Sequence, residues 1–511
     1  MFALILTPFL YIAGTVLWQG VPDTINSGDG ALLEMSTRSL FSRGILLGPY
    51  SRFLFFHPGP LYFVLRYPFY MAMGQRNSSF LIVTALISMA SLFGGWYIVR
   101  KLTNRLTSIL FSAVFALFLL NTDKMLWLSE WNPHIIMFPL MLFTVAMAAV
   151  GFRKVRYLYL AVFTGSFVAQ THIGGIPTLA VSAIAALLCA VYPRVITSGG
   201  NAARQGYFKY LLISSALLLF LWAPPIYEEF TAGNQGNMTR IREFFEDSDS
   251  DQDVETAFGP WSSTLAGFEL DRFARPLRDN GLADTAATII VALRILFLAM
   301  GYAILRRRGK YGFLCSLNLI CLLIHGMTFY SVSQIRGELH LYLIDWMRII
   351  APLSVFTVLA SLFALIGGVG RAATLRKYLK WFLVIFIVYS SIALPVNARG
   401  YFRTEPDRSW HSEIAVQELS VQLADFMDRQ PDCFYVLKLQ SQERWMVMFG
   451  LMNQLEKQGY PICMEDNVWF VSTLPPSDAA TRILHLGTLT GMGESSPSLI
   501  ARYDDIGIIL Q

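Results

Sequence analysis

Charged residues are scarce in this chain. Asp, Glu, Lys and Arg make up 15% of its 511 residues, and 54% are hydrophobic, whereas about 25% of the residues in a typical soluble domain are charged. A deficit of this size excludes a wholly water-soluble protein. It ends near residue 396, after which the composition becomes that of a soluble domain. The sequence therefore predicts a mainly α-helical polytopic membrane domain over residues 1–396 and a small external α/β domain over residues 397–511.

Cysteine is also rare, and its spacing is not that of a metal site. The chain has five Cys residues, of which Cys189, Cys315 and Cys321 lie in apolar runs, where a thiol behaves as a small hydrophobic group. Cys433 and Cys463 fall in the C-terminal domain. In an oxidising compartment these two thiols either pair or stay reduced, and the sequence leaves both outcomes open.

Apolar runs recur along the first 396 residues. A transmembrane helix needs about 20 apolar residues, and eleven runs meet or approach this length. The first run lacks a preceding basic region and a clear small-residue cleavage site, so we interpret it as an anchor and not as a cleaved signal peptide. The predicted spans lie near residues 2–20, 78–99, 106–121, 134–150, 157–173, 176–193, 209–224, 285–304, 312–330, 346–368 and 380–396.

Acidic residues are absent from the five short connections that follow the even-numbered spans. By the positive-inside rule, these basic connections are cytoplasmic. This predicts a cytoplasmic N-terminus in the cytoplasmic (inner) membrane and places the loops 21–77, 121–134, 225–284 and 331–345, with the C-terminal domain, outside. The basic residues of the five connections are Arg100, Lys101, Arg105, Arg153, Lys154, Arg156, Arg194, Arg204, Lys209, Arg306, Arg307, Arg308, Lys310, Arg371, Arg376, Lys377 and Lys380.

The net charge of +5 therefore reports membrane topology. Binding of nucleic acid would need basic residues gathered on one accessible face, and here they alternate with apolar spans. The sequence predicts no nucleic-acid partner. The partner that it does predict is the lipid bilayer.

The first external loop is unusually polar. Residues 28–44 have helical spacing, a turn rich in Gly and Pro follows, and residues 61–74 predict a short helix along the membrane surface. Polar side chains of this loop and of other predicted external segments form one group of candidates for a binding site. They are Asp29, Glu34, Arg38, Tyr50, Arg52, His57, Glu130, Asn132, His172, Glu228 and Arg336.

Several of these candidates have a simpler interpretation. Asp29 is placed to cap the helix that starts beside it. Glu34 and Arg38 are spaced four apart, as in an exposed helical ion pair. His172 lies between two spans, where a packing role is the commoner one. Local sequence does not decide between these roles and a function.

The order of motifs in the first 120 residues resembles the polytopic glycosyltransferases of the GT-C class. The likeness is greatest to the branch of protein O-mannosyltransferases and lipid A aminoarabinose transferases, in which a helix D-E-x-x-Y-A-x-x-A-R follows the first span and K-P-P-L-Y-Y precedes the second. In this chain the corresponding helix is "GDGALLEMSTRSL", in which Asp29 aligns with the Asp of the motif and Arg38 with its Arg. "HPGPLYF" places His57 at the phosphate-contacting Lys. Gly30 replaces the second acidic residue, and the pattern is also similar to a divergent branch for furanose sugars such as arabinofuranose.

This resemblance implies an inverting glycosyltransferase. Such an enzyme moves a sugar from a polyprenyl-phosphate donor to a hydroxyl of a glycan, lipid or protein acceptor on the outer face of the membrane. Asp29 would be the catalytic base. Arg52, His57 and Arg336 would stabilise the departing phosphate, with Tyr50 as a hydrogen-bond donor. His in place of Lys would make the phosphate contact depend on pH.

The resemblance implies no definite cofactor. A divalent metal that bridges the donor phosphate and carboxylates such as Asp29 and Glu130 is compatible with it, although nothing in the sequence indicates one. Such a metal is therefore left open.

Two other functions remain open. A transporter or flippase of a lipid-linked sugar would share this composition, but transporters usually show internal repeats and polar breaks at mid-membrane. This chain shows no repeat of fixed period and little charge in its spans. A non-catalytic assembly protein that presents the C-terminal domain would make Asp29 dispensable.

Overall fold

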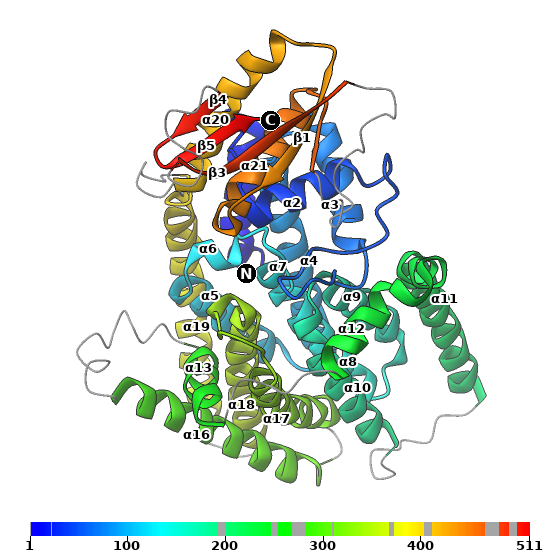
Figure 1. The fold of residues 1–511 in the computed structure, drawn as a ribbon. Coiled ribbons are helices and arrows are strands. Elements are labelled where there is room, and N and C mark those ends of the chain that lie inside the picture. Colours follow the sequence, from blue (N-terminus) through cyan, green and yellow to red (C-terminus); the bar gives the residue numbers. More distant parts are fainter. Residues whose placement is uncertain are drawn as a thin grey trace. The chain divides into compact units, whose positions relative to one another are not determined.

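The structure is a computed structural model, and it describes residues 2–21, 23–191, 201–246, 254–267, 282–308, 311–366, 372–402, 411–464, 480–489 and 498–511. Helices dominate it (Figure 1). The chain divides into two compact units. Unit 1 contains Met1–Gln19, His57–Tyr62 and Leu81–Tyr401, and unit 2 contains Gly20–Phe56, Phe63–Phe80 and Phe402–Gln511. The predicted domain boundary after residue 396 stays a prediction, and most of the first external loop groups with the C-terminal residues.

Unit 1 is built from apolar helices, which stand at all eleven predicted spans. The first span consists of α1 (Thr7–Thr15) with single turns before and after it. The other ten are α4 (Ser79–Leu102), α5 (Arg105–Asn121), α8 (Met137–Gly151), α9 (Leu158–Thr171), α10 (Ile176–Val191), α11 (Asn201–Ala232), α16 (Leu282–Leu305), α17 (Gly312–Ser333), α18 (Ile350–Ile366) and α19 (Ala372–Arg399).

Nine segments of the described residues are long and apolar enough to cross a membrane, and these include the first span. The two other predicted spans form the shorter helices α5, with 17 residues, and α9, with 14 residues. The chain is therefore a polytopic membrane protein with a mainly α fold. The expected count of about eleven spans is thus two higher than the number of described segments that are both long enough and apolar enough to cross a membrane.

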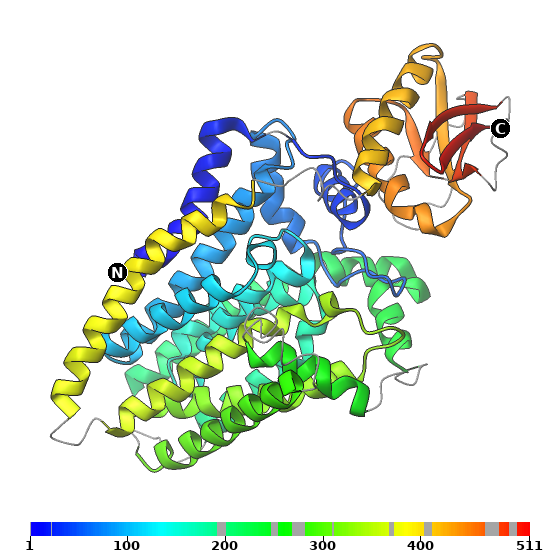
Figure 2. The ribbon, with the colours of Figure 1, turned by 90° about the vertical axis from the view of Figure 1, so that its left-hand side faces the viewer.

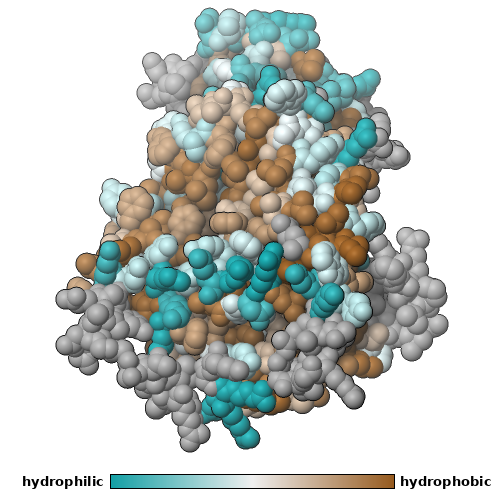
Figure 3. Space-filling view, turned by 180° about the vertical axis from the view of Figure 1, so that it is seen from behind, coloured by the Kyte–Doolittle hydropathy of each residue, from teal (hydrophilic) through white to brown (hydrophobic). Residues whose placement is uncertain are grey.

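Several helices of unit 1 expose apolar side chains. On α11 these include Leu219 and Phe220, and on α19 Phe382 and Ile392. α19 packs along α1 and α5 (Figure 2), which leaves another side of it uncovered. On the face shown in Figure 3, apolar side chains form broad continuous fields. Exposed apolar surface on this scale indicates contact with lipid.

The segment predicted as an external loop over residues 225–284 contains more helix than expected. α11 continues through Pro224 and Pro225 to Ala232, so Glu228 lies in its last turns and not in a loop. α12 (Asn237–Glu246) and α13 (Val254–Ala266) follow. The sequence between Glu246 and Asp253 is rich in acidic residues, and most of it, residues 247–253, lies outside the described residues.

A buried arginine holds the end of α13. Arg294 lies in the middle of the span Thr285–Leu305 and is 5% exposed. Its guanidinium donates to the main-chain oxygens of Leu265, at 2.5 Å, and Ala266, at 3.0 Å. The last carbonyls of a helix have no partner within the helix, and an apolar environment supplies none. Arg294 therefore satisfies these carbonyls, a role that the composition of the span did not suggest.

Unit 2 joins residues from both ends of the chain. Its N-terminal part supplies α2 (Gly28–Arg38) and most of α3 (Leu61–Ala72), and its C-terminal part supplies α20 (His411–Asp428) and α21 (Trp445–Lys457). α2 is shorter than the helix predicted over residues 28–44. It ends at Arg38, and Phe41 beyond it is 68% exposed, so Phe41 does not share the buried side of the helix.

A mixed five-stranded sheet completes unit 2. Its strands are β1 (Cys433–Leu439), β2 (Ile462–Met464), β3 (Ala480–Thr488), β4 (Leu499–Tyr503) and β5 (Ile506–Leu510). Their order is β2-β1-β3-β5-β4, with β1 parallel to β2 and β3, and β5 antiparallel to β3 and β4. A small α/β C-terminal domain is thus present, as predicted. Strand-like sequence at residues 432–439, 460–471, 481–487 and 504–510 predicts β1, β2, β3 and β5, whereas β4 is a strand that the sequence pattern did not reveal.

The two cysteines of unit 2 are free in the structure. In the parallel pair of β1 and β2, Cys463 lies opposite Val436, three residues along from Cys433. Three residues of strand span about 10 Å, whereas Cα atoms joined by a disulfide lie within about 7 Å. The register of the strands therefore keeps the two thiols apart.

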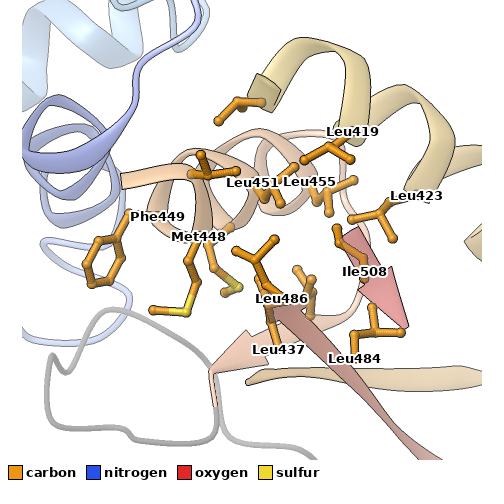
Figure 4. Packing of buried hydrophobic residues seen from close by; sticks show 14 of the residues in the cluster. Leu419, Leu423, Leu437, Met448, Phe449, Leu451, Leu455, Leu484, Leu486 and Ile508 are labelled. Atoms are coloured by element: carbon orange, nitrogen blue, oxygen red, sulfur yellow. The ribbon is translucent and has the colours of Figure 1, made fainter. Parts of the chain in front are cut away.

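The core of unit 2 lies between α20, α21 and the sheet. Figure 4 shows leucines of α20 and α21 meeting β1, β3 and β5. Ala31, Leu32 and Met35 of α2 belong to the same buried cluster. The C-terminal domain therefore shares its hydrophobic core with the helix that follows the first span.

Candidate active site

Asp29 is the second residue of α2. The N-cap position belongs to Ser27, whose backbone is extended, so the interpretation of Asp29 as the N-cap is wrong. Asp29 is half-buried. Burial, and then the negative charge of Asp29, raise the pKa of Tyr50 to about 12. The structure thus brings these two predicted site residues together, and it keeps the Tyr50 phenol protonated as a hydrogen-bond donor at neutral pH.

The segment after Tyr50 is a tight loop. Tyr50 and Phe56 pair in an isolated antiparallel bridge, and the Ser51 amide donates to the Phe55 carbonyl at 3.0 Å. Arg52 lies in this loop, with its guanidinium carbon 4.9 Å from the centre of the Phe53 ring. His57, the next residue after Phe56, is the first of its segment in unit 1.

Glu34 and Arg38 do not form an exposed ion pair. Glu34 is 1% exposed, and its carboxylate accepts from Asn26, Asn453, Tyr70 and Lys457 at 2.8–3.0 Å. Arg38 instead bonds Glu456 at 2.6 Å and Asn453 at 2.9 Å. Protein groups thus occupy the oxygens of Glu34. The predicted roles of Glu34 and Arg38 in substrate binding stay predictions.

His57 is buried in unit 1 beside His172. Its Nδ1 accepts the Ile173 amide at 3.1 Å, and the centres of the two imidazole rings are 5.0 Å apart. Burial, with His172 as a smaller contribution, holds the pKa of His57 well below its usual range. His57 is therefore neutral at pH 7, with its proton on Nε2. It offers a hydrogen-bond donor there and no positive charge, and any dependence of this contact on pH lies below pH 6.5.

A depressed pKa of His57 predicts a loss of folding stability in acid. Since the unfolded chain takes up this proton near pH 6.5 and the folded chain only at lower pH, the stabilising contribution is complete above about pH 6.5 and is lost as the pH falls. We expect His57→Gln to weaken the fall in thermal unfolding midpoint between pH 7.5 and pH 5. The exposed His340→Gln is the control, and an unchanged pH dependence in His57→Gln would contradict the prediction.

Further polar residues of unit 1 connect the segments around His172. Gln170 accepts the Leu61 amide at 3.3 Å and donates to the Leu221 carbonyl at 2.8 Å. Asn132, at the start of the short helix α7 (Asn132–Ile135), donates to the Thr171 carbonyl at 3.4 Å. The structure therefore brings the predicted residues His57, Asn132 and His172 into one buried polar region.

A carboxylate group that the site prediction did not include lies in the same unit, with a histidine and an arginine as neighbours. His134 Nε2 is 3.6 Å from Asp345 Oδ2, and Asp345 also accepts from Arg348 at 2.7 Å. Asp345 lies at the boundary of a predicted span, where a carboxylate needs a partner. The position of Asp345 at the edge of a span was therefore a signal in the sequence that it has partners, but nothing in the sequence identified His134 as one of them.

The remaining predicted residues occupy other surroundings in unit 1. Glu228 accepts the Asn237 amide at 3.2 Å and so helps to cap α12. The guanidinium of Arg336 stacks on Phe244 at 4.0 Å. Burial, and then the charge of Glu130, raise the pKa of Tyr401. Their predicted roles in substrate binding stay predictions.

Among the residues that the structure describes, no three His, Cys, Asp or Glu side chains gather as a metal would require. We therefore derive no step through a metal.

Comparison with known proteins identifies the fold. No family model and no curated protein matches the chain. It is similar in structure to ArnT from Cupriavidus metallidurans, whose crystal structure contains undecaprenyl phosphate. The match covers 98% of this chain and 97% of that chain, with 12% sequence identity and a TM-score of 0.54. The GT-C-like fold expected from the resemblance is thereby confirmed.

Proposed function

We propose that this chain is an inverting glycosyltransferase. It transfers a sugar from a polyprenyl-phosphate donor to a hydroxyl of a glycan, lipid or protein acceptor at the outer face of the cytoplasmic membrane. The observation that carries the proposal is the fold shared with ArnT over nearly the full length of both chains. Because ArnT binds undecaprenyl phosphate, a donor lipid of this kind is the natural candidate.

The chemistry that we assign to Asp29 is that of a general base. The acceptor oxygen attacks the anomeric carbon of the sugar and forms the new C–O bond, while Asp29 takes the hydroxyl proton. The bond from the anomeric carbon to the phosphate oxygen breaks, and its electron pair leaves with the lipid phosphate. A single displacement of this type inverts the configuration of the anomeric carbon.

The departing phosphate needs groups that stabilise its negative charge. Arg52 and Arg336 are the candidates with a permanent charge. Tyr50 and His57 are neutral donors at pH 7: a phenol is protonated at this pH even without the rise in its pKa, and burial lowers the pKa of His57. We therefore assign the charge to the two arginines and directional hydrogen bonds to Tyr50 and His57.

Transfer by the purified full-length chain tests the function. The chain is reconstituted in liposomes that contain undecaprenyl-phosphate sugars extracted from the native host, together with host envelope glycans. We expect a new glycosidic product, found by mass spectrometry, and equal release of undecaprenyl phosphate. Movement of the lipid-linked sugar across the bilayer without a glycosidic product would instead indicate a flippase and overturn the proposal.

A further inference from the structure

The side of α2 opposite Asp29 is bound by C-terminal residues of unit 2. At 3.6 residues per turn, Arg38 lies about 180° around the helix from Asp29, and Glu34 lies about 140° from it. Both of these side chains bond to α21, which packs beside α2 (Figure 1). α2 is therefore held on one side and presents Asp29 on another.

Asn453 bonds to both of these residues of α2. It is 2% exposed and comes from the otherwise apolar side of α21. Its Nδ2 donates to Glu34 Oε2 at 2.8 Å, and its Oδ1 accepts from Arg38 Nη1 at 2.9 Å. One buried amide thus bonds an acid and a base that are one turn apart on α2.

Apolar packing alone would not fix how α2 is rotated about its axis. The contacts of Ala31, Leu32 and Met35 with the core are not directional, whereas hydrogen bonds weaken steeply when their angle changes. The amide of Asn453 matches the donor and acceptor pattern of α2 in one rotation only. A rotation by one residue would turn Glu34 and Arg38 away from it by about 100°.

The start of α2 is also packed closely against α21. A Cβ atom on Gly28 would lie 3.2 Å from Met446, and one on Gly450 would lie 3.0 Å from the Asn26 carbonyl. Ser27 and Ser412, at the start of α20, share a hydrogen bond of 3.0 Å. These contacts set the position of the residues directly before Asp29. The rotation of the helix is set by Asn453 at the centre, with Glu456 and Lys457 of α21 bonding the same two side chains.

We propose that Asn453 is a positioning residue, through which the C-terminal domain orients the Asp29 carboxylate for catalysis. This inference rests on the proposed function, because it assigns a catalytic task to Asp29. It gives the C-terminal domain a part in the reaction. Asn453 itself touches no substrate and acts through α2.

The test is Asn453→Leu in the full-length chain, with rates normalised to folded protein. Leu has the same branched arrangement of side-chain heavy atoms, although it is bulkier, and it removes both bonds. We expect kcat for sugar transfer to fall by about 10²-fold, because a small misplacement of a catalytic group can lower the rate by this factor. The KM for the undecaprenyl-phosphate donor should stay unchanged. Hydrogen exchange of the α2 amides should speed up, while that of β1 and β3 stays at the wild-type rate.

Two further variants make the outcome decisive. Asn453→Gln keeps an amide that can still donate to Glu34 and accept from Arg38, so it is expected to fold and to show a smaller fall in kcat. Glu418→Gln, at an exposed position of α20, should leave kcat and exchange unchanged. A wild-type kcat in Asn453→Leu would overturn the inference, and so would a fall in stability without a change in kcat per folded molecule.

Failure of the proposed function has a different signature. In that case the wild-type chain forms no glycosidic product, and Asp29→Asn is indistinguishable from it. The positioning role then falls as well. If wild-type transfer is normal and Asp29→Asn is inactive, but Asn453→Leu has the wild-type kcat, the function stands and only the role of Asn453 is wrong.

Discussion

Asp29→Asn is expected to lower sugar transfer by about 10³-fold, within the range of about 10² to 10⁴ contributed by general base catalysis. Asn has the shape of Asp but accepts no proton at neutral pH, so the attacking hydroxyl keeps its proton. Because Asp29 is half-buried at the start of α2 and outside the core cluster, the variant should fold normally. The measurement is the rate of product formation at saturating donor.

The matched control for Asp29→Asn is Asp432→Asn, at an exposed position of unit 2. We expect wild-type transfer from it, since a surface carboxylate outside the site has no part in the chemistry. Persistence of rapid transfer in Asp29→Asn would show that Asp29 is not the base. It would favour an assembly protein or another carboxylate of the chain.

Glu34→Ala is expected to destabilise unit 2 by about 3–5 kcal/mol, the usual cost of breaking a buried ion pair. The substitution leaves Lys457, Asn453, Asn26 and Tyr70 without the acceptor that they share. For a unit of this size, about 1 kcal/mol shifts the unfolding midpoint by about 2–4 °C. The midpoint in detergent should therefore fall by about 10 °C.

The exposed Glu418→Ala serves as the comparison, because surface substitutions usually change stability by less than about 0.5 kcal/mol. A Glu34→Ala variant that unfolds at the wild-type midpoint would show that the buried network adds no net stability. Unit 2 would then depend on its apolar core alone.

Patterns along the chain were sufficient to predict the helices at the eleven apolar runs of unit 1, but not α12 and α13. Apolar runs long enough to cross a bilayer have few alternatives to helix, and the predicted positions agree with the observed helices. In the C-terminal domain, the short apolar segments predicted as strands became β1, β2, β3 and β5. β4 was missed, because the sequence "LIARY" has no clear alternation and gains its place by pairing with β5.

The surroundings of individual side chains were beyond these patterns. Glu34 and Arg38 have the spacing of an exposed pair, and the same spacing serves equally well for two residues that both bond a neighbouring helix. Arg294 looks like an isolated charge in a span, and only the arrival of α13 explains it. Burial depends on partners that are distant in the sequence, whereas periodicity reports only on neighbours.

Composition, hydropathy and charge alternation were enough to define the spans, the predicted orientation and the α/β character of the C-terminal domain, because each of these is a property of local segments in water or lipid. The sharing of one core by α2 and the C-terminal helices, and the bonds of Asn453 to α2, were decided only in three dimensions. The bonded residues of α2 and α21 are separated by about four hundred positions, and no local preference specifies which distant side chains satisfy a buried charge.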